Sequence, residues 1–320
     1  MAEPVEVAVA VLRAADGRVL VAERAAWRHE GGRLEFPGGK LDPGEEPGAA
    51  LARELEEELG VRLREWVPLL RLRHRYDERA VVLHVCEVQG WAGEPHGAEG
   101  QPLAWCRPED LRPEWFPDAN RPILAALQLP PHCLVTPAPE ADGLEATLGG
   151  LHAALAAGVR LVQLRAPQLG TADLGRFVDG ACATAAMAPA PVRLLLNSGD
   201  PAWLQRCPGL AGLHLSARAA SLLRRRPLPE GRLLSCACHD AAEIRQAERL
   251  GADLLVIGHV GPTPSHAERE PLGWDGLEAL TAATTLPAYA IGGLGPDDVP
   301  TARRHGAIGI AAIRGLWPGA

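Results

Sequence analysis

Apolar residues in the first third of the chain come in short runs separated by turns. The runs at 4–12 and 18–23 are rich in Val, Leu and Ala, and Ala15-Asp16-Gly17 between them has turn character. Residues 80–88 show the same β-rich pattern, and 102–106 form a shorter run. We therefore expect a β-sheet in this part of the chain.

Two stretches of the same region have a helical period instead. Leucines recur every four residues within 47–59, which places them on one face of a helix. A shorter helix is predicted over 119–128, immediately before a cluster of prolines that begins at Pro130. We place a domain boundary there, with one domain at 1–130 and a second at 131–320.

Beyond this boundary, short apolar runs alternate with Ala- and Leu-rich helical stretches. The runs are Cys133–Thr136, Arg160–Leu164, Val192–Leu196, Gly212–Leu215, Leu233–Ala237, Leu254–Ile257, Ala288–Ile291 and Ile308–Ala312. Eight β/α units predict an α/β domain in the form of a (β/α)8 TIM barrel, with active groups at the carboxyl ends of the strands. An open, doubly wound sheet is the alternative.

Composition and charge narrow the function classes. The 320 residues are 47% hydrophobic and 22% charged, as in ordinary globular proteins. The net charge of −8 argues against a sequence-independent nucleic-acid binder. The apolar runs are far shorter than the roughly 18 residues of a membrane helix, and the N-terminus has no basic leader pattern. We expect a cytoplasmic protein with neither nucleic acid nor membrane as a partner.

The acidic excess is concentrated in the first domain, where it suggests a cation site. Glu54, Glu57 and Glu58 share one face of the helix predicted at 47–59. Like charges at that spacing repel one another, and a hard divalent cation such as Mg2+ or Mn2+ would relieve the repulsion. Such a cation suits a phosphate substrate. A solvated acidic helix face is the alternative for these residues taken alone.

The spacing around this helix resembles the Nudix box. Gly39 is followed after five residues by Glu45, and after seven more by Arg-Glu-Leu-x-Glu-Glu-x-Gly-Val over 53–61. The resemblance implies a Nudix hydrolase, with an α/β/α sandwich around a mixed sheet. The resemblance also implies roles for single residues. Glu57, Glu58 and the Gly38 carbonyl would ligate a metal, and Glu54 would be a further ligand or the general base. Arg53 would orient a carboxylate, and Glu45 would support the loop and the metal shell.

The flanking segments resemble the mutator-type 8-oxo-dGTP diphosphatases of that family. The similar segments are 34–40, 91–97, 99–102 and 116–122. This likeness implies a nucleoside triphosphate substrate, cleaved to a monophosphate and pyrophosphate with Mg2+.

The same likeness implies a substrate pocket. Arg24 and Asn120 would contact the oxidised purine, Phe36 would line the pocket, and Glu99 would add a carboxylate to the metal site. An asparagine amide carries a donor and an acceptor, so it can read a purine edge. The alternatives are a helix N-cap for Asn120 and a surface ion pair for Arg24.

The second domain resembles thiamine phosphate synthase and its relative, the thiazole tautomerase. The likeness rests on Gln163 with Arg165, on Pro262-Thr263-Pro264-Ser265, and on Gly292 with Gly293 at the end of the seventh run. It implies a barrel that binds a thiazole phosphate or an aminopyrimidine pyrophosphate. Glycine-rich backbone there can donate N–H groups to an anion, although a tight βα turn also explains Gly292 and Gly293.

Several positions depart from the synthase pattern. Pro167 and Ser198 stand where the synthase has a lysine and a metal-binding aspartate, and a second such aspartate is missing from 214–218. His259 instead resembles the acid/base histidine of the tautomerase, and a histidine satisfied by hydrogen bonds at a strand end is the alternative. We expect a barrel that binds phosphate without synthase activity.

Three functional hypotheses follow. The first is hydrolysis of 8-oxo-dGTP. The second keeps the Nudix reaction but assigns it to a pyrophosphate of the thiamine pathway, with the barrel as a thiazole tautomerase. In the third, the barrel is a non-catalytic module that binds a ligand.

Overall fold

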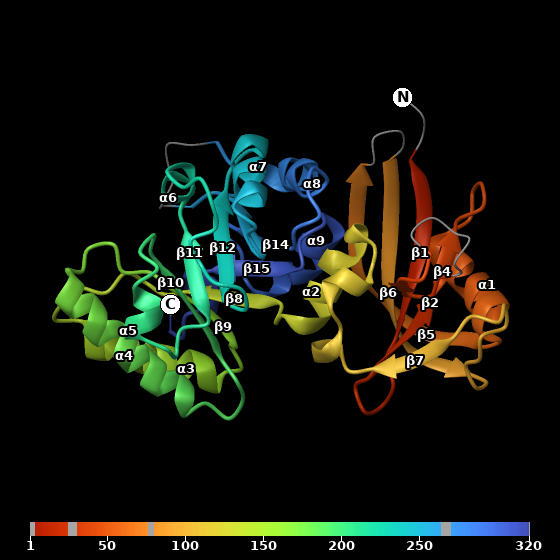
Figure 1. Ribbon diagram of the computed structural model, residues 1–320, viewed down its shortest axis with the longest axis horizontal. Helices are drawn as coiled ribbons and strands as arrows, with labels where there is room; N and C mark the ends of the chain where they lie inside the picture. The colour runs from red at the N-terminus through yellow and green to blue at the C-terminus, as the bar shows by residue number, and fades with distance from the viewer. Residues whose placement is uncertain (1–3, 25–30, 76–79, 264–269, 320) are drawn as a thin grey trace. The chain divides into compact units, whose positions relative to one another are not determined.

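The computed structural model describes residues 4–24, 31–75, 80–263 and 270–319 (Figure 1). The chain divides into two compact units. The first comprises Met1–Gln128 with Thr281–Thr285 and Arg303–Gly306, and the second comprises Leu129–Leu280, Leu286–Ala302 and Ala307–Ala320. The main elements of the first unit are β1 (Val5–Leu12), β2 (Val19–Glu23), β3 (Leu34–Glu35), β4 (Gly38–Lys40), α1 (Pro47–Leu59), β5 (Arg62–Arg75), β6 (Ala80–Ala92), β7 (Leu103–Cys106) and α2 (Arg121–Gln128). Each unit is described by itself below.

The strands of the first unit form two sheets. The larger has the order β4-β1-β6-β5, in which β1 and β6 run parallel and the outer pairs are antiparallel. The smaller has the antiparallel order β3-β2-β7. The expected mixed sheet is confirmed, and the strands predicted at 4–12 and 18–23 correspond to β1 and β2.

Helix α1 has the bounds that the leucine spacing predicts. Pro47 occupies the first turn, where its missing N–H costs no hydrogen bond. Leu51, Leu55 and Leu59 are fully buried and pack with the alanines of β1 into one core. The opposite face of α1 is left for charged side chains.

Strand β5 has no counterpart in the pattern-based prediction. Leu70 and Leu72 are buried while their neighbour Arg71 is partly exposed, which is the alternation of a half-buried strand. Pro68 obscures this pattern in the sequence. It is accommodated because β5 lies at the edge of the sheet and has a register shift between Pro68 and Leu70.

The second unit contains a closed barrel. Its strands are β8 (His132–Val135), β9 (Leu161–Leu164), β10 (Arg193–Asn197), β11 (Gly212–Leu215), β12 (Leu233–Cys238), β13 (Leu254–Gly258), β14 (Ala288–Ile291) and β15 (Gly309–Ala312). In the described chain these eight strands pair in parallel, and β15 pairs with β8 to close the ring. The predicted (β/α)8 barrel is confirmed, and closure excludes the open sheet.

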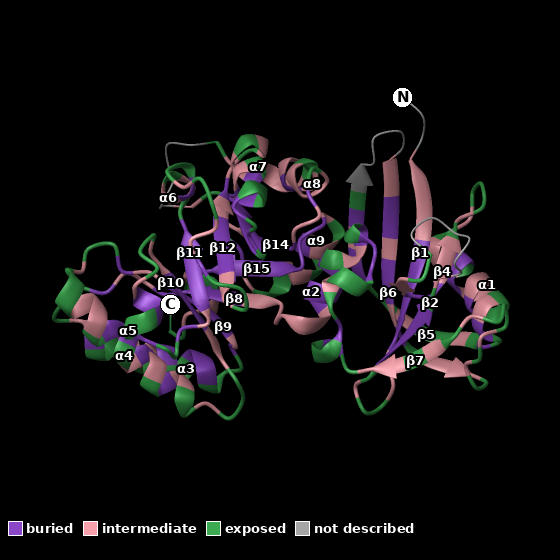
Figure 2. Ribbon diagram, in the orientation of Figure 1, coloured by how far each residue is buried: buried purple, intermediate pink, exposed green. Residues whose placement is uncertain are grey.

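Helices surround the barrel and complete its core. They are α3 (Leu144–Ala156), α4 (Thr171–Ala186), α5 (Trp203–Arg206), α6 (Ala217–Ser221), α7 (Ala241–Arg249), α8 (Gly273–Thr281) and α9 (Val299–Arg304). The barrel strands are largely buried (Figure 2). Among the described residues, none of the helices combines the length and apolar character that a bilayer crossing requires.

Candidate functional site

The acidic face predicted for residues 47–59 is present on α1. The Glu54 side chain keeps only 14% of its surface exposed, whereas Glu57 keeps 58%. Glu58 is half-buried, and its carboxylate accepts a hydrogen bond from the Gly38 N–H at 3.0 Å. The acidic face is therefore not uniformly solvated, because two of its three carboxylates lie against the protein.

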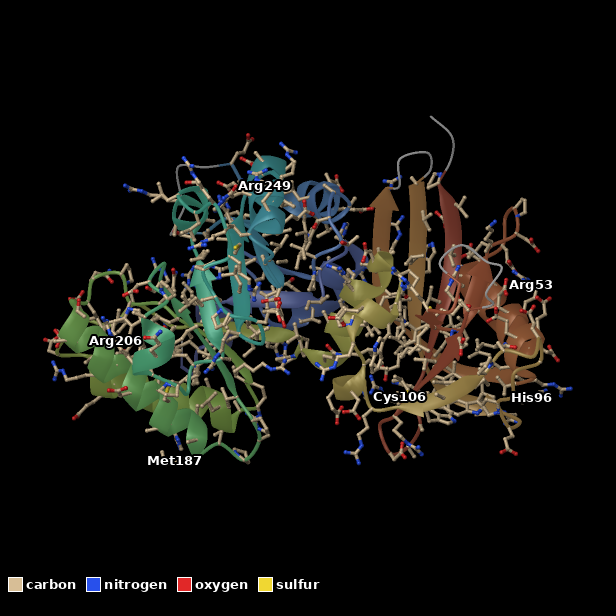
Figure 3. The ribbon with its side chains drawn as sticks, in the orientation of Figure 1. Arg53, His96, Cys106, Met187, Arg206 and Arg249 are labelled. Atoms are coloured by element: carbon tan, nitrogen blue, oxygen red, sulfur yellow. The ribbon has the colours of Figure 1, made fainter. Side chains whose placement is uncertain are left out.

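Arg53, which is labelled beside α1 in Figure 3, connects the loop before α1 to this face. Its guanidinium donates to Glu45 at 3.0 and 3.2 Å, to Glu54 at 2.8 Å and to the Lys40 carbonyl at 3.0 Å. Hydrogen bonds from Arg53 and from the Asp42 N–H hold the pKa of Glu45 below its usual range. Arg53 thus fixes the Glu54 carboxylate and the loop together.

A second loop is tied to the carboxyl end of α1. The Gln101 side chain donates to the Glu58 carbonyl at 2.8 Å and accepts from the Glu99 N–H at 3.0 Å. The Ala98 N–H also donates to the Glu58 carbonyl, at 3.0 Å. Glu99, which is 41 positions later in the sequence than Glu58, is thereby held next to the acidic face.

The electrostatics of the acidic face suit a bound cation. Burial raises the pKa of the Glu58 carboxyl to about 7, and the negative charges of Glu35, Glu54 and Glu99 add to this effect. A divalent cation would reverse it by favouring the ionised form. In the described parts of the chain, no three acidic, histidine or cysteine side chains already converge at metal-binding distance. The donor set fits a hard cation, and binding would draw the carboxylates together.

The predicted base-pocket residues lie on three separate segments of the first unit. Phe36 is buried and stacks on Phe116 with the ring centroids 5.4 Å apart. Arg24 forms an ion pair with Glu35, but the pair is mostly covered rather than on the surface, with 23% and 21% of the two side chains exposed. Asn120 ends a 3-10 turn, Asp118–Asn120. Asn120 therefore immediately precedes α2, which is the position of the helix N-cap alternative, and its contact with a base stays a prediction.

The barrel residues matched to the synthase pattern lie at the carboxyl ends of the strands. Gln163 is buried on β9, and the Arg165 N–H donates to the buried Thr136 hydroxyl at 2.9 Å. This bond joins the ends of β8 and β9. It places Arg165 at the end of the barrel where active groups are expected.

The loops after β13 and β14 are locked together. The Val260 and Gly261 N–H groups donate to the Ile291 and Gly292 carbonyls at 2.8 and 3.0 Å. A Cβ on Gly292, whose φ is 117°, would lie 2.4 Å from the Cβ of His259, so this contact requires glycine. The close packing of these two loops thus agrees with a tight βα turn at Gly292. Anion binding by its backbone stays a prediction.

His259 is buried in this loop, and its Nδ1 lies 3.1 Å from the Gly261 carbonyl. That contact accounts for Nδ1 of the imidazole, and the acid/base role of His259 stays a prediction. Gly293 also lies in the locked region, with a φ of 68°. Of the Pro262-Thr263-Pro264-Ser265 motif, Pro264 and Ser265 lie outside the described residues.

Two polar features were not assigned a role from the sequence. Glu35 contacts Arg24. Its position next to Phe36 was the clue that the sequence offered. In the barrel, His214 Nδ1 lies 2.9 Å from the Ser235 hydroxyl, and burial lowers the pKa of His214 to about 4. His214 and Ser235 are the third residues of β11 and of β12, and this matching position is only a weak indication in the sequence.

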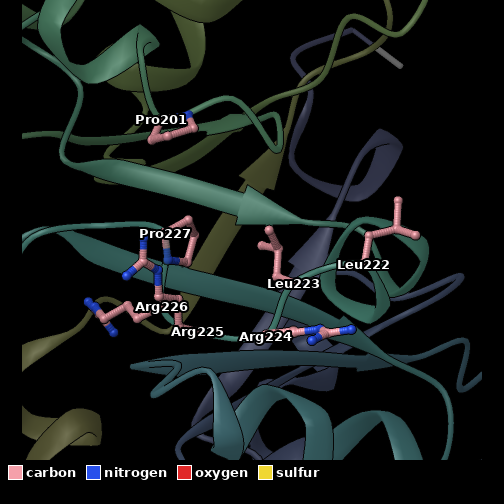
Figure 4. A pocket seen from close by; sticks show the side chains of 7 residues that line it. All are labelled: Pro201, Leu222, Leu223, Arg224, Arg225, Arg226 and Pro227. Carbon is pink, nitrogen blue, oxygen red and sulfur yellow. The ribbon is translucent and has the colours of Figure 1, made fainter.

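A hollow on the barrel surface lies outside these predicted sites (Figure 4). Its lining residues are Pro201, Leu222, Leu223, Arg224, Arg225, Arg226 and Pro227. The Arg226 guanidinium donates to the Arg232 carbonyl at 2.6 Å and to Asp253 at 2.8 Å. Arg226 therefore fastens the segment before β12 to the segment before β13, which is a structural role.

Comparison with known proteins assigns each unit to a family. The NUDIX domain model matches residues 3–127, and the thiamine monophosphate synthase model matches residues 132–316. An 8-oxo-dGTP diphosphatase of Escherichia coli K12 is 37% identical over 123 residues, which are 38% of this chain and 95% of that protein. A CTP pyrophosphohydrolase of the same organism is 34% identical over 38% of this chain and 90% of its own length.

The barrel has its own relatives. A thiamine-phosphate synthase of Herpetosiphon aurantiacus is 30% identical over 165 residues, which cover 51% of this chain and 78% of that protein. The two sets of relatives match separate parts of the chain. The protein is therefore a Nudix hydrolase, an enzyme that cleaves phosphoric anhydrides, fused to a member of the thiamine monophosphate synthase family.

Proposed function

We propose that the N-terminal unit hydrolyses 8-oxo-dGTP to 8-oxo-dGMP and pyrophosphate, with Mg2+ as its metal. The carrying observation is the acidic face of α1, where Glu54 and Glu58 are drawn in by Arg53 and by the Gly38 N–H. The similarity to an 8-oxo-dGTP diphosphatase over 95% of its length supports the substrate. Removal of an oxidised nucleotide from the precursor pool, and hence avoidance of mutation, is the role that this reaction supports.

The metal would be held by the Gly38 carbonyl and by the carboxylates of Glu54, Glu57, Glu58 and Glu99. When bound, it supplies neutralisation of the triphosphate and activation of water for in-line displacement. The described geometry supports this set because Glu58 bonds to the Gly38 N–H and the loop bearing Glu99 is tied to the end of α1.

The chain's own residues would orient the reaction. Glu54 would accept the proton of the attacking water, and Arg53 holds one oxygen of that carboxylate at 2.8 Å. The Asn120 amide would read the oxidised purine edge with its donor and acceptor, with Arg24 beside it. Phe36, held by its stacking on Phe116, would form the apolar wall of the base pocket.

The test is a substrate panel with Mg2+ that contains 8-oxo-dGTP, dGTP, CTP and an aminopyrimidine pyrophosphate. We expect preference for 8-oxo-dGTP, release of pyrophosphate, and loss of activity in Glu54→Gln and Glu57→Gln. Glu56→Gln is the matched control, because Glu56 is an exposed residue of the same helix. Asn120→Ala should reduce the preference for the oxidised purine. Faster turnover of CTP or of the pyrimidine pyrophosphate would reject the proposed substrate.

For the barrel, we propose phosphate binding without thiamine phosphate synthesis. Gln163, Arg165 and the backbone of Gly292 and Gly293 would hold the phosphate of a thiazole or pyrimidine ligand. The replacement of a lysine by Pro167 and of metal-binding carboxylates elsewhere supports the loss of synthesis, because Mg–pyrophosphate needs those charges. His259 would be the acid/base residue if the barrel retains tautomerase activity.

This second proposal is tested with the full chain. Calorimetry with thiazole phosphate should show binding that Arg165→Ala weakens, while Arg176→Ala, at an exposed residue of α4, leaves it unchanged. Incubation with thiazole phosphate and aminopyrimidine pyrophosphate should yield no thiamine phosphate. Robust formation of thiamine phosphate would overturn the proposal.

A further inference from the structure

Glu35 and Arg24 form a covered ion pair at the start of the base pocket. Glu35 lies on β3, which pairs with β2 so that Glu35 is opposite Ala22, two residues before Arg24. The two side chains contact each other, and only 21% and 23% of their surfaces are exposed. The Arg24 backbone is fixed as well, since its N–H donates to the Arg33 carbonyl at 2.8 Å.

Glu35 also lies close in sequence to the residues around the acidic face of α1. It directly precedes Phe36, and three residues later the Gly38 N–H donates to Glu58 at 3.0 Å. The negative charge of Glu35 acts on the Glu58 carboxyl, as the charges of Glu54 and Glu99 do. Glu35 therefore contacts Arg24, which is expected to hold the base, and its charge acts on Glu58, which is expected to hold the metal.

This placement has two consequences for a nucleotide. An arginine side chain carries about 2 kcal/mol of rotamer entropy, and a carboxylate partner in a covered site removes much of its freedom before a ligand arrives. The carboxylate also neutralises the guanidinium. An uncompensated Arg24 would attract the triphosphate into the base pocket, whereas the neutral pair favours an uncharged base there.

We propose that Glu35 is a positioning residue, which directs the Arg24 guanidinium toward the purine and keeps phosphate groups out of the base pocket. This inference rests on the proposed function of the N-terminal unit, which assigns Arg24 to the substrate. Glu35 acts through Arg24, so removing Glu35 should matter only while Arg24 is present.

A double-mutant cycle tests this dependence. Binding of 8-oxo-dGMP is measured by calorimetry without metal for the wild type, Glu35→Ala, Arg24→Ala and the double variant. We expect Glu35→Ala to weaken binding by about 10- to 100-fold, as for loss of a charged hydrogen bond, and by less than about twofold in the Arg24→Ala background. With 8-oxo-dGTP and Mg2+, KM should rise while kcat stays within about threefold.

Two further variants keep the result interpretable. Glu23→Ala removes an exposed carboxylate on the neighbouring strand β2 and should leave binding within twofold of the wild type. Glu35→Gln retains the size and an acceptor oxygen, so it should restore part of the affinity. It also serves in the cycle if thermal melting shows that Glu35→Ala does not fold.

Equal losses from Glu35→Ala in both backgrounds would overturn the proposal, as would a loss confined to kcat with unchanged binding. If the wild type does not bind 8-oxo-dGMP, the proposed substrate fails first. The same cycle, run with the monophosphate of the nucleotide that the wild type hydrolyses fastest, then decides the role of Glu35 separately.

Discussion

Replacing Gly39 by alanine should remove activity while leaving the fold intact. A Cβ on Gly39 would lie 2.0 Å from Oε1 of Glu54 and 2.2 Å from its Cδ, whereas ordinary contacts begin at 3.4 Å. The carboxylate must therefore move by about 1 Å or more, which breaks its 2.8 Å hydrogen bond from Arg53. A displacement of about 1 Å in a catalytic site can cost about 100-fold in rate.

The cost to stability should be small, because the displaced atoms are the end of a flexible side chain on a partly open helix face. We expect a change of less than about 1 kcal/mol in the free energy of unfolding. The assay is kcat for 8-oxo-dGTP together with urea unfolding of each variant. Gly149→Ala is the matched control, since a Cβ there meets nothing within 4 Å and α3 should be slightly stabilised.

If Gly39→Ala retains activity within threefold of the wild type, the placement of the Glu54 carboxylate beside Gly39 is not what catalysis requires. If it loses activity together with several kcal/mol of stability, the substitution has disturbed β4 rather than Glu54. Only activity loss in a normally stable protein supports the reasoning.

Three further predictions concern charged groups in both units. Because the pKa of Glu58 is raised to about 7, Mg2+ must displace a proton from this carboxyl at lower pH. The Mg2+ affinity, measured by calorimetry, should therefore fall by up to about tenfold between pH 7 and pH 6. It should not change with pH above pH 8. Burial lowers the pKa of His214 to about 4, below the unfolded value near 6.5, so the unfolded state binds the extra proton between these values. The barrel should therefore lose up to about 3 kcal/mol of stability as pH falls from 6.5 to 4. In His214→Asn, the free energy of unfolding should depend less steeply on pH. An unchanged pH dependence would exclude His214 as its source. Arg226→Leu should cost about 1–3 kcal/mol in chemical unfolding because it removes the hydrogen bonds to the Arg232 carbonyl at 2.6 Å and to Asp253 at 2.8 Å. Arg225→Leu, at an exposed residue, should cost less than about 0.5 kcal/mol.

Much of the fold follows from local pattern. The four-residue spacing of leucines fixes α1, because only one face of a helix can be buried. The eight short apolar runs fix the barrel strands, since buried parallel strands are apolar along their whole length. The sequence pattern does not predict strand β5, because Pro68 interrupts its alternation of buried and exposed residues. The strand is evident only from its pairing with β6.

The candidate site divides in the same way. The residue types and spacing of Glu54, Glu57 and Glu58 place them on one helix face without any tertiary information. Their different exposure is not in the sequence. Glu57 is exposed while Glu58 is half-buried, because the Gly38 N–H contacts the Glu58 carboxylate.

The sequence by itself thus determined the two domains, the barrel strands, the acidic helix and the family of each part, since these depend on periodicity and on motif spacing within short segments. The tertiary structure alone decided that the charges of Glu35, Glu54 and Glu99 act on the Glu58 carboxyl. It also decided that Glu35 pairs with Arg24 where both side chains are mostly covered. It also joined His214 to Ser235 across neighbouring strands. Such pairings depend on burial and on contacts between distant segments, and electrostatic interactions acquire their strength only when the folded chain excludes water from them.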